Sequence, residues 1–351
     1  MRASWAWCLL CLLTWIVLVQ TSEWFLPATL LAYGPRFVLL LPFVALIPLA
    51  LITSRIALIP LSVALLVVLG PIMGARLAWE TILHRQPAAS HPDVLRVLTF
   101  NTEGGDAIAK QLRELVSRQI PDIIALQECG DVLWDSLQAL PRWHSARYAQ
   151  MCSASRWPIA STDTMPRRGF ERISKFGFGG TGGAVRYVFD TPKGPLALVN
   201  LHLETARKGL EGLMGKDGFV PDQLRLPEPE TAKHSEEMSS RITLNTKIRD
   251  LESERASVWS VHFERAIPVL IAGDFNLPVE SAIFRKHWGA FTDAFESSGT
   301  GFGWTKSEGR LLHIRIDHIL GSEMAPRPVG IWLGADLGSD HLPVIADFRW
   351  R

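Results

Sequence analysis

The stretch Pro268-Val269-Leu270-Ile271-Ala272-Gly273-Asp274-Phe275-Asn276 decides how the second half of this chain is interpreted. Its first four residues are apolar and mostly branched, which predicts a buried strand. Gly273 permits a tight turn, so Asp274 and Asn276 can project toward one place at the strand end. A carboxylate beside an amide suits a water or phosphoryl oxygen held next to a hard metal ion. Taken alone, the stretch also fits an ordinary turn.

Other polar residues also lie at the ends of apolar strands. Strands are expected at residues 94–100, 123–126, 183–189, 196–203, 268–271, 315–320 and 344–348. The polar residues at their ends are Asn101, Glu103, Glu128, His202, Asp274, Asn276, Asp317, Asp340 and His341. No Ser or Cys nucleophile stands beside a base in this set. So many acids, amides and imidazoles at strand ends indicate one shared site.

Helices are expected between these strands, at about 106–118, 132–140, 239–263 and 279–287. Strands outnumber helices and pair with near neighbours as often as they cross over. This order predicts an α/β fold in which two sheets pack together with helices outside.

The first 85 residues are interpreted as a membrane anchor. Three stretches without Asp, Glu, Lys or Arg are each near the length of a membrane-crossing helix. They predict transmembrane helices at about 3–22, 37–54 and 56–75, the last two forming a hairpin that turns at Thr53-Ser54-Arg55.

The alternative for the first stretch is a cleaved signal peptide. Only Arg2 stands at its basic end and no clear small-x-small cleavage site precedes Glu23, which favours a retained span. Three spans place the two chain ends on opposite sides of the membrane. The distribution of basic residues does not decide the orientation. With Arg2 inside, the soluble domain lies outside the cytoplasm, and this is the placement we expect.

Residues 86–93 form a polar linker to a domain at 94–351. From residue 86 onward the chain has 31 basic and 33 acidic residues, a net charge of minus two. A domain that bound long nucleic acid mainly through phosphate neutralisation would be basic. The basic cluster at 167–175 is either a local patch or a solvated loop.

The four cysteines define no framework by their spacing. Cys8 and Cys11 are expected to pack within the first span. Cys129 is interpreted as a small buried side chain, with a disulfide to Cys152 as the alternative.

Six motifs, in order, resemble the endonuclease/exonuclease/phosphatase superfamily. They are Asn101 after Leu98-Thr99-Phe100, Leu126-Gln127-Glu128, Asn200-Leu201-His202, Gly273-Asp274-Phe275-Asn276, Ile316-Asp317-His318 and Ser339-Asp340-His341. Ser155-Arg156-Trp157-Pro158-Ile159 is also similar to a segment of that family. The resemblance covers about residues 94–351. It implies a DNase I-like four-layer α/β sandwich, two packed mixed sheets flanked by helices, that hydrolyses phosphoester bonds.

The resemblance implies Mg²⁺ or Mn²⁺ as the cofactor. Glu128 would be the principal metal ligand, helped by Asn101 and, less directly, by Glu103 and Asp340. Mg²⁺ keeps several waters when bound to protein, so one strong carboxylate with weak helpers is sufficient.

The same resemblance implies five catalytic residues. Asp274 and Asn276 would orient or deprotonate the attacking water and hold the phosphate. His202 and His341 would bind the scissile phosphate and stabilise charge. Asp317 would support His341, since a carboxylate on one imidazole nitrogen fixes the tautomer and favours protonation.

Two nearby features are not included among the predicted site residues. His318 varies in the family and is left out of the site. Residues 205–233, rich in Gly, Pro and charge, form an insertion directly after Glu204. We expect this insertion to overhang the site and to select substrates.

The leading interpretation is an integral, multi-pass membrane protein whose outer domain is a metal-dependent phosphoesterase. A phosphodiester is the expected substrate, with a phosphomonoester as the alternative. Nucleic acid and lipid or other small phosphodiesters both stay open, and no protein partner is predicted. The competing interpretation is a membrane-tethered binding module that has the fold without turnover.

Overall fold

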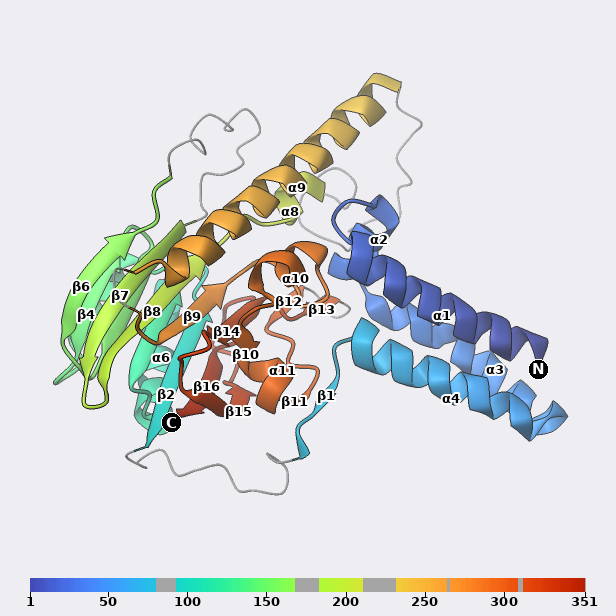
Figure 1. Cartoon of the computed structure of the whole chain (residues 1–351), viewed down its shortest axis with the longest axis horizontal. Helices are drawn as coiled ribbons and strands as arrows, with labels where there is room; N and C mark the ends of the chain where they lie inside the picture. Colours follow the sequence, from blue (N-terminus) through green and yellow to red (C-terminus); the bar gives the residue numbers. More distant parts are fainter. Residues whose placement is uncertain (80–92, 168–182, 211–231, 264–265, 309–311, 351) are drawn as a thin grey trace.

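A computed structural model describes residues 1–79, 93–167, 183–210, 232–263, 266–308 and 312–350 (Figure 1). Two six-stranded sheets pack against each other, and helices cover the outer face of each sheet. The expected four-layer α/β sandwich is therefore confirmed. The apolar amino-terminal helices extend away from it (Figure 1).

The first sheet has the strand order β15-β16-β2-β3-β5-β4. Its strands are β2 (Val94–Asn101), β3 (Ile123–Gln127), β4 (His144–Tyr148), β5 (Met151–Ser155), β15 (Arg327–Leu333) and β16 (Val344–Arg349). Only β2 and β3 are parallel neighbours. The helices α6 (Ala109–Gln119) and α7 (Asp131–Gln138) cover the outer face of this sheet.

The second sheet has the order β10-β14-β9-β8-β7-β6. Its strands are β6 (Ile159–Thr164), β7 (Gly183–Thr191), β8 (Gly194–His202), β9 (Val269–Asp274), β10 (Thr292–Asp293) and β14 (Asp317–Gly321). Here β8 and β9 are the parallel pair. The helices α9 (Ala232–Val261) and α10 (Ala282–Trp288) pack on its outer face.

Strand β2 shows how the sequence builds these layers. Leu95 and Val97 lie in the core between the two sheets, whereas Leu98 and Phe100 pack against the helices outside. Successive strand residues point to opposite faces, so a strand covered on both faces is mainly apolar. All four side chains are fully buried.

Three apolar helices precede the sandwich. They are α1 (Arg2–Thr21), the continuous run of η1 (Arg36–Leu40) with α3 (Leu41–Thr53), and the run of η2 (Arg55–Ala57), α4 (Leu58–Val67) and η3 (Val68–Ile72). Each is long and apolar enough to cross a membrane. A further short helix, α2 (Leu26–Tyr33), was not expected.

Short elements complete the described chain. They are β1 (Arg76–Leu77), η4 (Asp106–Ile108), α8 (Arg207–Leu210), α11 (Ala294–Ser298), β11 (Thr300–Gly301), β12 (Lys306–Glu308) and β13 (Leu312–Ile314).

The sequence interpretation missed several strands. No strand was expected in the regions that form β4, β5, β6 and β15. The helix expected at 239–263 begins earlier, at Ala232. Most of the linker at 86–93, of the basic cluster at 167–175 and of the insertion at 205–233 lies outside the described residues.

Cys129 and Cys152 form a disulfide between the loop after β3 and strand β5. The prediction of a free, buried Cys129 is therefore wrong, although both side chains are buried. The reason is the antiparallel pairing of β3 with β5, which sets Cys152 opposite Leu126. Spacing in the sequence does not reveal that pairing.

Candidate active site

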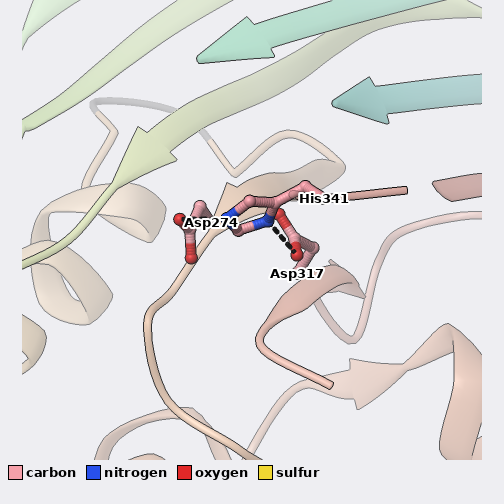
Figure 2. Close-up of side chains that lie close together, drawn as sticks. All are labelled: Asp274, Asp317 and His341. Carbon is pink, nitrogen blue, oxygen red and sulfur yellow. Dashed lines mark hydrogen bonds and ion pairs between the residues drawn. The ribbon is translucent and has the colours of Figure 1, made fainter. Parts of the chain in front are cut away.

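Three neighbouring strands of the second sheet present polar side chains at one level. Asp274 at the end of β9 is in register with His202 on β8 and with Asp317 on β14. His341 reaches the same place from the residues just before β16 in the other sheet. Figure 2 shows Asp274, Asp317 and His341 grouped together. The fold therefore joins strand-end residues from both sheets.

Gly273 allows strands β8 and β9 to approach each other beside the site. Its φ of +148° is a conformation that other residues rarely adopt. A Cβ at this position would lie 1.9 Å from the backbone oxygen of Leu201 on β8. The glycine before Asp274 is thus required by the close contact of two backbones.

Asp317 holds His341 in one orientation. Asp317 Oδ2 lies 2.8 Å from His341 Nδ1, and both residues are buried. Burial alone would lower the pKa of His341, but the carboxylates of Asp317 and Asp274 outweigh it and raise that pKa to about 9. Burial would likewise raise the pKa of Asp317, yet the His341 charge brings it below its usual value. The pair is ionic at neutral pH.

Asp274 is a buried carboxylate with hydrogen bonds on both oxygens. The Asn276 N–H donates to Oδ1 at 2.8 Å, and Asn101 Nδ2 donates to Oδ2 at 3.0 Å. His341 Nε2 lies 3.6 Å from Oδ2. Burial and the nearby charge of Asp317 raise the pKa of Asp274. A carboxylate with a raised pKa is a better proton acceptor.

Glu128 forms the more exposed side of the site. Its side chain is 34% exposed, whereas that of Asp274 is 2% exposed. Asn101 Nδ2 donates to Glu128 Oε1 at 3.1 Å and so bridges the two carboxylates. His202 Nε2 lies between them, 3.8 Å from Glu128 Oε1 and 3.7 Å from Asp274 Oδ2.

Three of the expected site residues have left-handed backbone conformations. Glu103, Glu128 and Asn276 have φ values of +50°, +51° and +51°. Such conformations are uncommon for residues other than glycine, and they cluster at functional sites. At Asn276, Nδ2 donates to the backbone oxygen of Leu203 at 2.8 Å, which ties this residue to the end of β8.

Glu103 and Asp340 meet at the outer edge of the site. The Asp340 N–H donates to Glu103 Oε2 at 3.3 Å. The Asp340 carboxylate pairs with Lys306, with Nζ 2.5 Å from Oδ2. Asp340 therefore neutralises a cation in this structure. Its expected role as a metal helper stays a prediction.

Lys306 is the site residue that the sequence interpretation missed. Its Nζ lies 3.0 Å from His341 Nε2. Burial would lower the pKa of Lys306, but Asp340 and the other site carboxylates raise it. Strand β12 brings Lys306 here through a backbone bridge to His341. A lysine at the start of a three-residue strand carries no local sequence signal.

His318 contributes to packing. Its Nδ1 lies 2.8 Å from Asp293 Oδ2, and its Nε2 lies 2.9 Å from the backbone oxygen of Leu277. Both ring nitrogens are thus occupied, and the ring packs edge-on against Phe275.

The site contains two sets of possible metal ligands, and they differ in how well they suit a divalent metal. Asp274, Asp317 and His341 offer three atoms within 4.8 Å of one another. A His341 that is protonated on both nitrogens cannot ligate a metal. The partly exposed Glu128 carboxylate is a hard oxygen donor open to water, as Mg²⁺ requires. Asn101 Oδ1 accepts from the Glu103 N–H at 3.0 Å, so Asn101 here supports the carboxylates through Nδ2.

Comparison with known proteins identifies the family. Residues 98–341 match the model of the Endonuclease/Exonuclease/phosphatase family. The match covers more than half of the chain, and the protein belongs to this family. A search of curated protein sequences found no significant match.

Solved structures with a similar fold share little sequence. D. rerio TDP2 humanized by 14 mutations and D. rerio TDP2 complexed with a single-strand DNA product each give a TM-score of 0.50. Each is 15% identical, over 73% of this chain and 99% of that one. Sphingomyelinase C from Streptomyces griseocarneus gives a TM-score of 0.45 at 16% identity, over 73% and 99%. Such low identities show the fold alone.

Proposed function

We propose that this protein is a membrane-anchored, divalent-metal-dependent phosphodiesterase. The observation that carries the proposal is the strand register that sets His202, Asp274 and Asp317 side by side, with His341 against the two carboxylates. Asp274 as a proton acceptor, His341 as a cation and Glu128 as a hard oxygen donor then surround one point. Phosphoester hydrolysis needs these three functions.

Asp274 is the proposed base. Its raised pKa favours uptake of a proton from the attacking water. The Asn276 N–H and the Asn101 amide hold the carboxylate in place, so little reorganisation accompanies the reaction.

His341, Lys306 and His202 are the proposed donors to the phosphate. Lys306 Nζ can donate to His341 Nε2 only if that nitrogen carries no proton. The pKa of about 9, however, puts a proton on His341 Nε2 at neutral pH. A phosphoryl oxygen between the two groups removes this conflict, because both then donate to it. Such charge-assisted bonds strengthen as negative charge grows in the transition state.

Glu128 would hold Mg²⁺ or Mn²⁺, with Asn101 and Glu103 as supporting residues. When bound, the cation supplies positive charge to the phosphoryl oxygens. Asp340 is assigned to Lys306, which it keeps charged and directed toward His341.

We propose that residues 1–85 anchor the protein in a membrane through three spanning helices, with the catalytic domain outside the cytoplasm. The length and composition of the three helices support the anchor. The disulfide between Cys129 and Cys152 supports the placement, because disulfides persist in oxidising compartments.

A phosphodiester headgroup at the bilayer surface is the favoured substrate. Phe302 and Trp304 stack on each other and pack against the cluster of apolar-helix residues. Lys306, only two residues later, lies in the site. One edge of the site therefore adjoins the anchor, while the domain lacks the basic charge expected for long nucleic acid.

The test is hydrolysis by the full-length protein in lipid nanodiscs. The substrates are phosphodiester-headgroup lipids, plasmid DNA, RNA and a chromogenic phosphodiester, each with Mg²⁺, with Mn²⁺ and with chelator. We expect metal-dependent turnover, preferentially of lipid, that is lost in Asp274→Ala. Preferential turnover of DNA or RNA would replace the lipid proposal with a nuclease. No turnover from folded protein would favour the binding module.

A further inference from the structure

Residues 22–36, which join the first two apolar runs, are built into the catalytic domain. The short helix α2 lies in this segment, beside the domain at the end of α1 (Figure 1). Within residues 22–36, the polar side chains of Ser22, Glu23, Thr29 and Tyr33 are all buried. Burial of polar and charged groups costs free energy unless each is well paired, and a simple tether does not need it. The partners of these side chains therefore matter.

Ser22 and Glu23 bind the start of α10. The Ala282 N–H donates to Ser22 Oγ at 2.8 Å and to Glu23 Oε2 at 3.1 Å. The Ser281 hydroxyl, which caps α10 by accepting from Phe284, donates to Glu23 Oε1. Helix α10 starts shortly after Asn276, so these bonds fix the far end of the loop that carries Asn276.

Tyr33 supports Asn276 itself. Its hydroxyl lies 3.5 Å from the backbone oxygen of Asn276 and 3.3 Å from Glu23 Oε1. Arg249 Nη2 donates both to the Tyr33 hydroxyl and, at 3.2 Å, to the Asn276 oxygen. Burial raises the pKa of Tyr33, so its hydroxyl keeps the proton that these acceptors share. The unusual backbone of Asn276 is thus held from the anchor side.

Arg36 provides a third attachment. Its Nη1 lies 3.0 Å from Glu280 Oε2, in the middle of the same loop. Burial would raise the pKa of Glu280, but Arg36 and Arg315 lower it below its usual value, so the pair is ionic. Arg36 also donates to the backbone oxygens of Ala32 and Ile72, which fixes it to the apolar helices.

We propose that residues 22–36 are a positioning part of the active site. Glu23, Tyr33 and Arg36 hold the loop at 276–282, and through the Asn276 N–H they hold the carboxylate of Asp274. Hydrolysis then depends on the seating of the anchor against the domain. The expected effect on the rate of hydrolysis rests on the proposed function, whereas the positioning of the loop at 276–282 by residues 22–36 does not.

A double-mutant cycle in full-length protein in nanodiscs tests this proposal. Tyr33→Phe keeps the ring and removes the hydroxyl. We expect kcat to fall about tenfold with KM changed less than about twofold, because small displacements at a reacting centre cost rate. In a Glu23→Ala background, where the loop is already released at its α10 end, the same substitution should cost much less, because both residues hold one loop. Equal losses in both backgrounds would overturn the proposal.

Arg76→Ala is the matched control. It breaks the ion pair to Glu296, which also joins the anchor region to the domain but touches none of the site residues. We expect kcat to stay at the wild-type value. A loss like that of Tyr33→Phe would mean that any weakening of the anchor contact matters, and would overturn the specific role of residues 22–36.

Hydrogen exchange gives a readout without activity. The amides of Asn276 and Ala282 both donate bonds that depend on this loop. Tyr33→Phe and Glu23→Ala should speed exchange across 274–284 about tenfold, with β2 and β3 unchanged. Unchanged exchange in both variants would refute the positioning. If exchange responds while wild type hydrolyses nothing, the proposed function fails and the positioning stands.

Discussion

Lys306 Nζ and His341 Nε2 lie 3.0 Å apart, and each cation has its own carboxylate partner. Asp340 pairs with Lys306, and Asp317 pairs with His341. Two positive groups held this close by separate anions form a binding site for a negatively charged oxygen. The Lys306 charge lowers the pKa of His341, whereas the Asp317 carboxylate raises it, and experiments can separate these two effects.

Lys306→Met should reduce kcat/KM by about 10²-fold, because one donor to the phosphate is lost. The Lys306 charge lowers the pKa of His341, so its removal should move the basic limb of the pH–rate profile to higher pH. A pH series of initial rates measures both effects. A basic limb that moves down would contradict the assignment.

Asp317→Asn should have the opposite effect on the pH profile. Without the Asp317 carboxylate, the pKa of His341 drops from about 9, and the basic limb moves toward neutral pH. Asp190→Asn, which changes an exposed carboxylate on β7, is the control and should leave the limb in place. An unchanged limb in Asp317→Asn would show that His341 does not govern it.

The ion pair between Asp317 and His341 also makes the stability of the domain depend on pH. A raised folded-state pKa means that His341 contributes its full stabilisation below its ordinary pKa of 6.5 and loses it as pH rises through about 9. The melting temperatures of wild type and Asp317→Asn should therefore converge between pH 6 and pH 10. A constant difference over this range would argue against the ionic pair.

Glu128→Gln should reduce activity by about 10²- to 10³-fold and raise the Mg²⁺ concentration needed for half-maximal rate. Chelator should abolish the activity of the wild type. In Asp340→Asn the Mg²⁺ requirement should stay close to that of wild type, since Asp340 is paired with Lys306. Metal titrations of initial rate distinguish the two carboxylates.

Gly273→Ala should destabilise the domain by about 4 kcal/mol or more, since the new methyl meets the Leu201 backbone. Gly194→Ala is the matched comparison. Gly194 also has a positive φ, of +105°, but no atom lies within 4 Å of a Cβ there, so the cost should be about 1 kcal/mol. Thermal unfolding of both variants measures the difference, and similar shifts would contradict the close-approach argument.

Replacing Cys129 and Cys152 together by serine should destabilise the domain by about 3 kcal/mol, given the 23 residues that separate the cysteines. Because Cys129 follows Glu128, the variant should also need more Mg²⁺. Thiol labelling of unfolded wild type checks the bridge. Labelling of all four cysteines without reductant would show that no disulfide forms.

The strand-end residues were predictable because each lies near one end of an apolar strand in a recognisable motif. Asp274, His202 and Asp317 needed only the strand pattern and the family resemblance, and the register of β8, β9 and β14 then brings them together. The nearly continuous apolar run of β2 is likewise typical of a strand covered on both faces.

Residues that act through tertiary contact were not predictable. Lys306 stands in a three-residue strand without a motif, and Tyr33 and Glu23 lie between two predicted membrane spans of the anchor. Their roles depend on pairings between segments far apart in the sequence. Strands β4 and β5 were missed because β4 is only partly buried and lacks an apolar pattern.

The position of β16 has a consequence for biosynthesis. This strand follows all the others in the chain, yet it lies in the interior of its sheet between β15 and β2. During translation β2 is made early, but its partner strand β16 is made only when nearly the whole domain has been synthesised. The sheet and the His341 side of the site are therefore completed only after the ribosome has passed β16. Folding of this domain is therefore completed late in its synthesis, and the candidate site is incomplete until then.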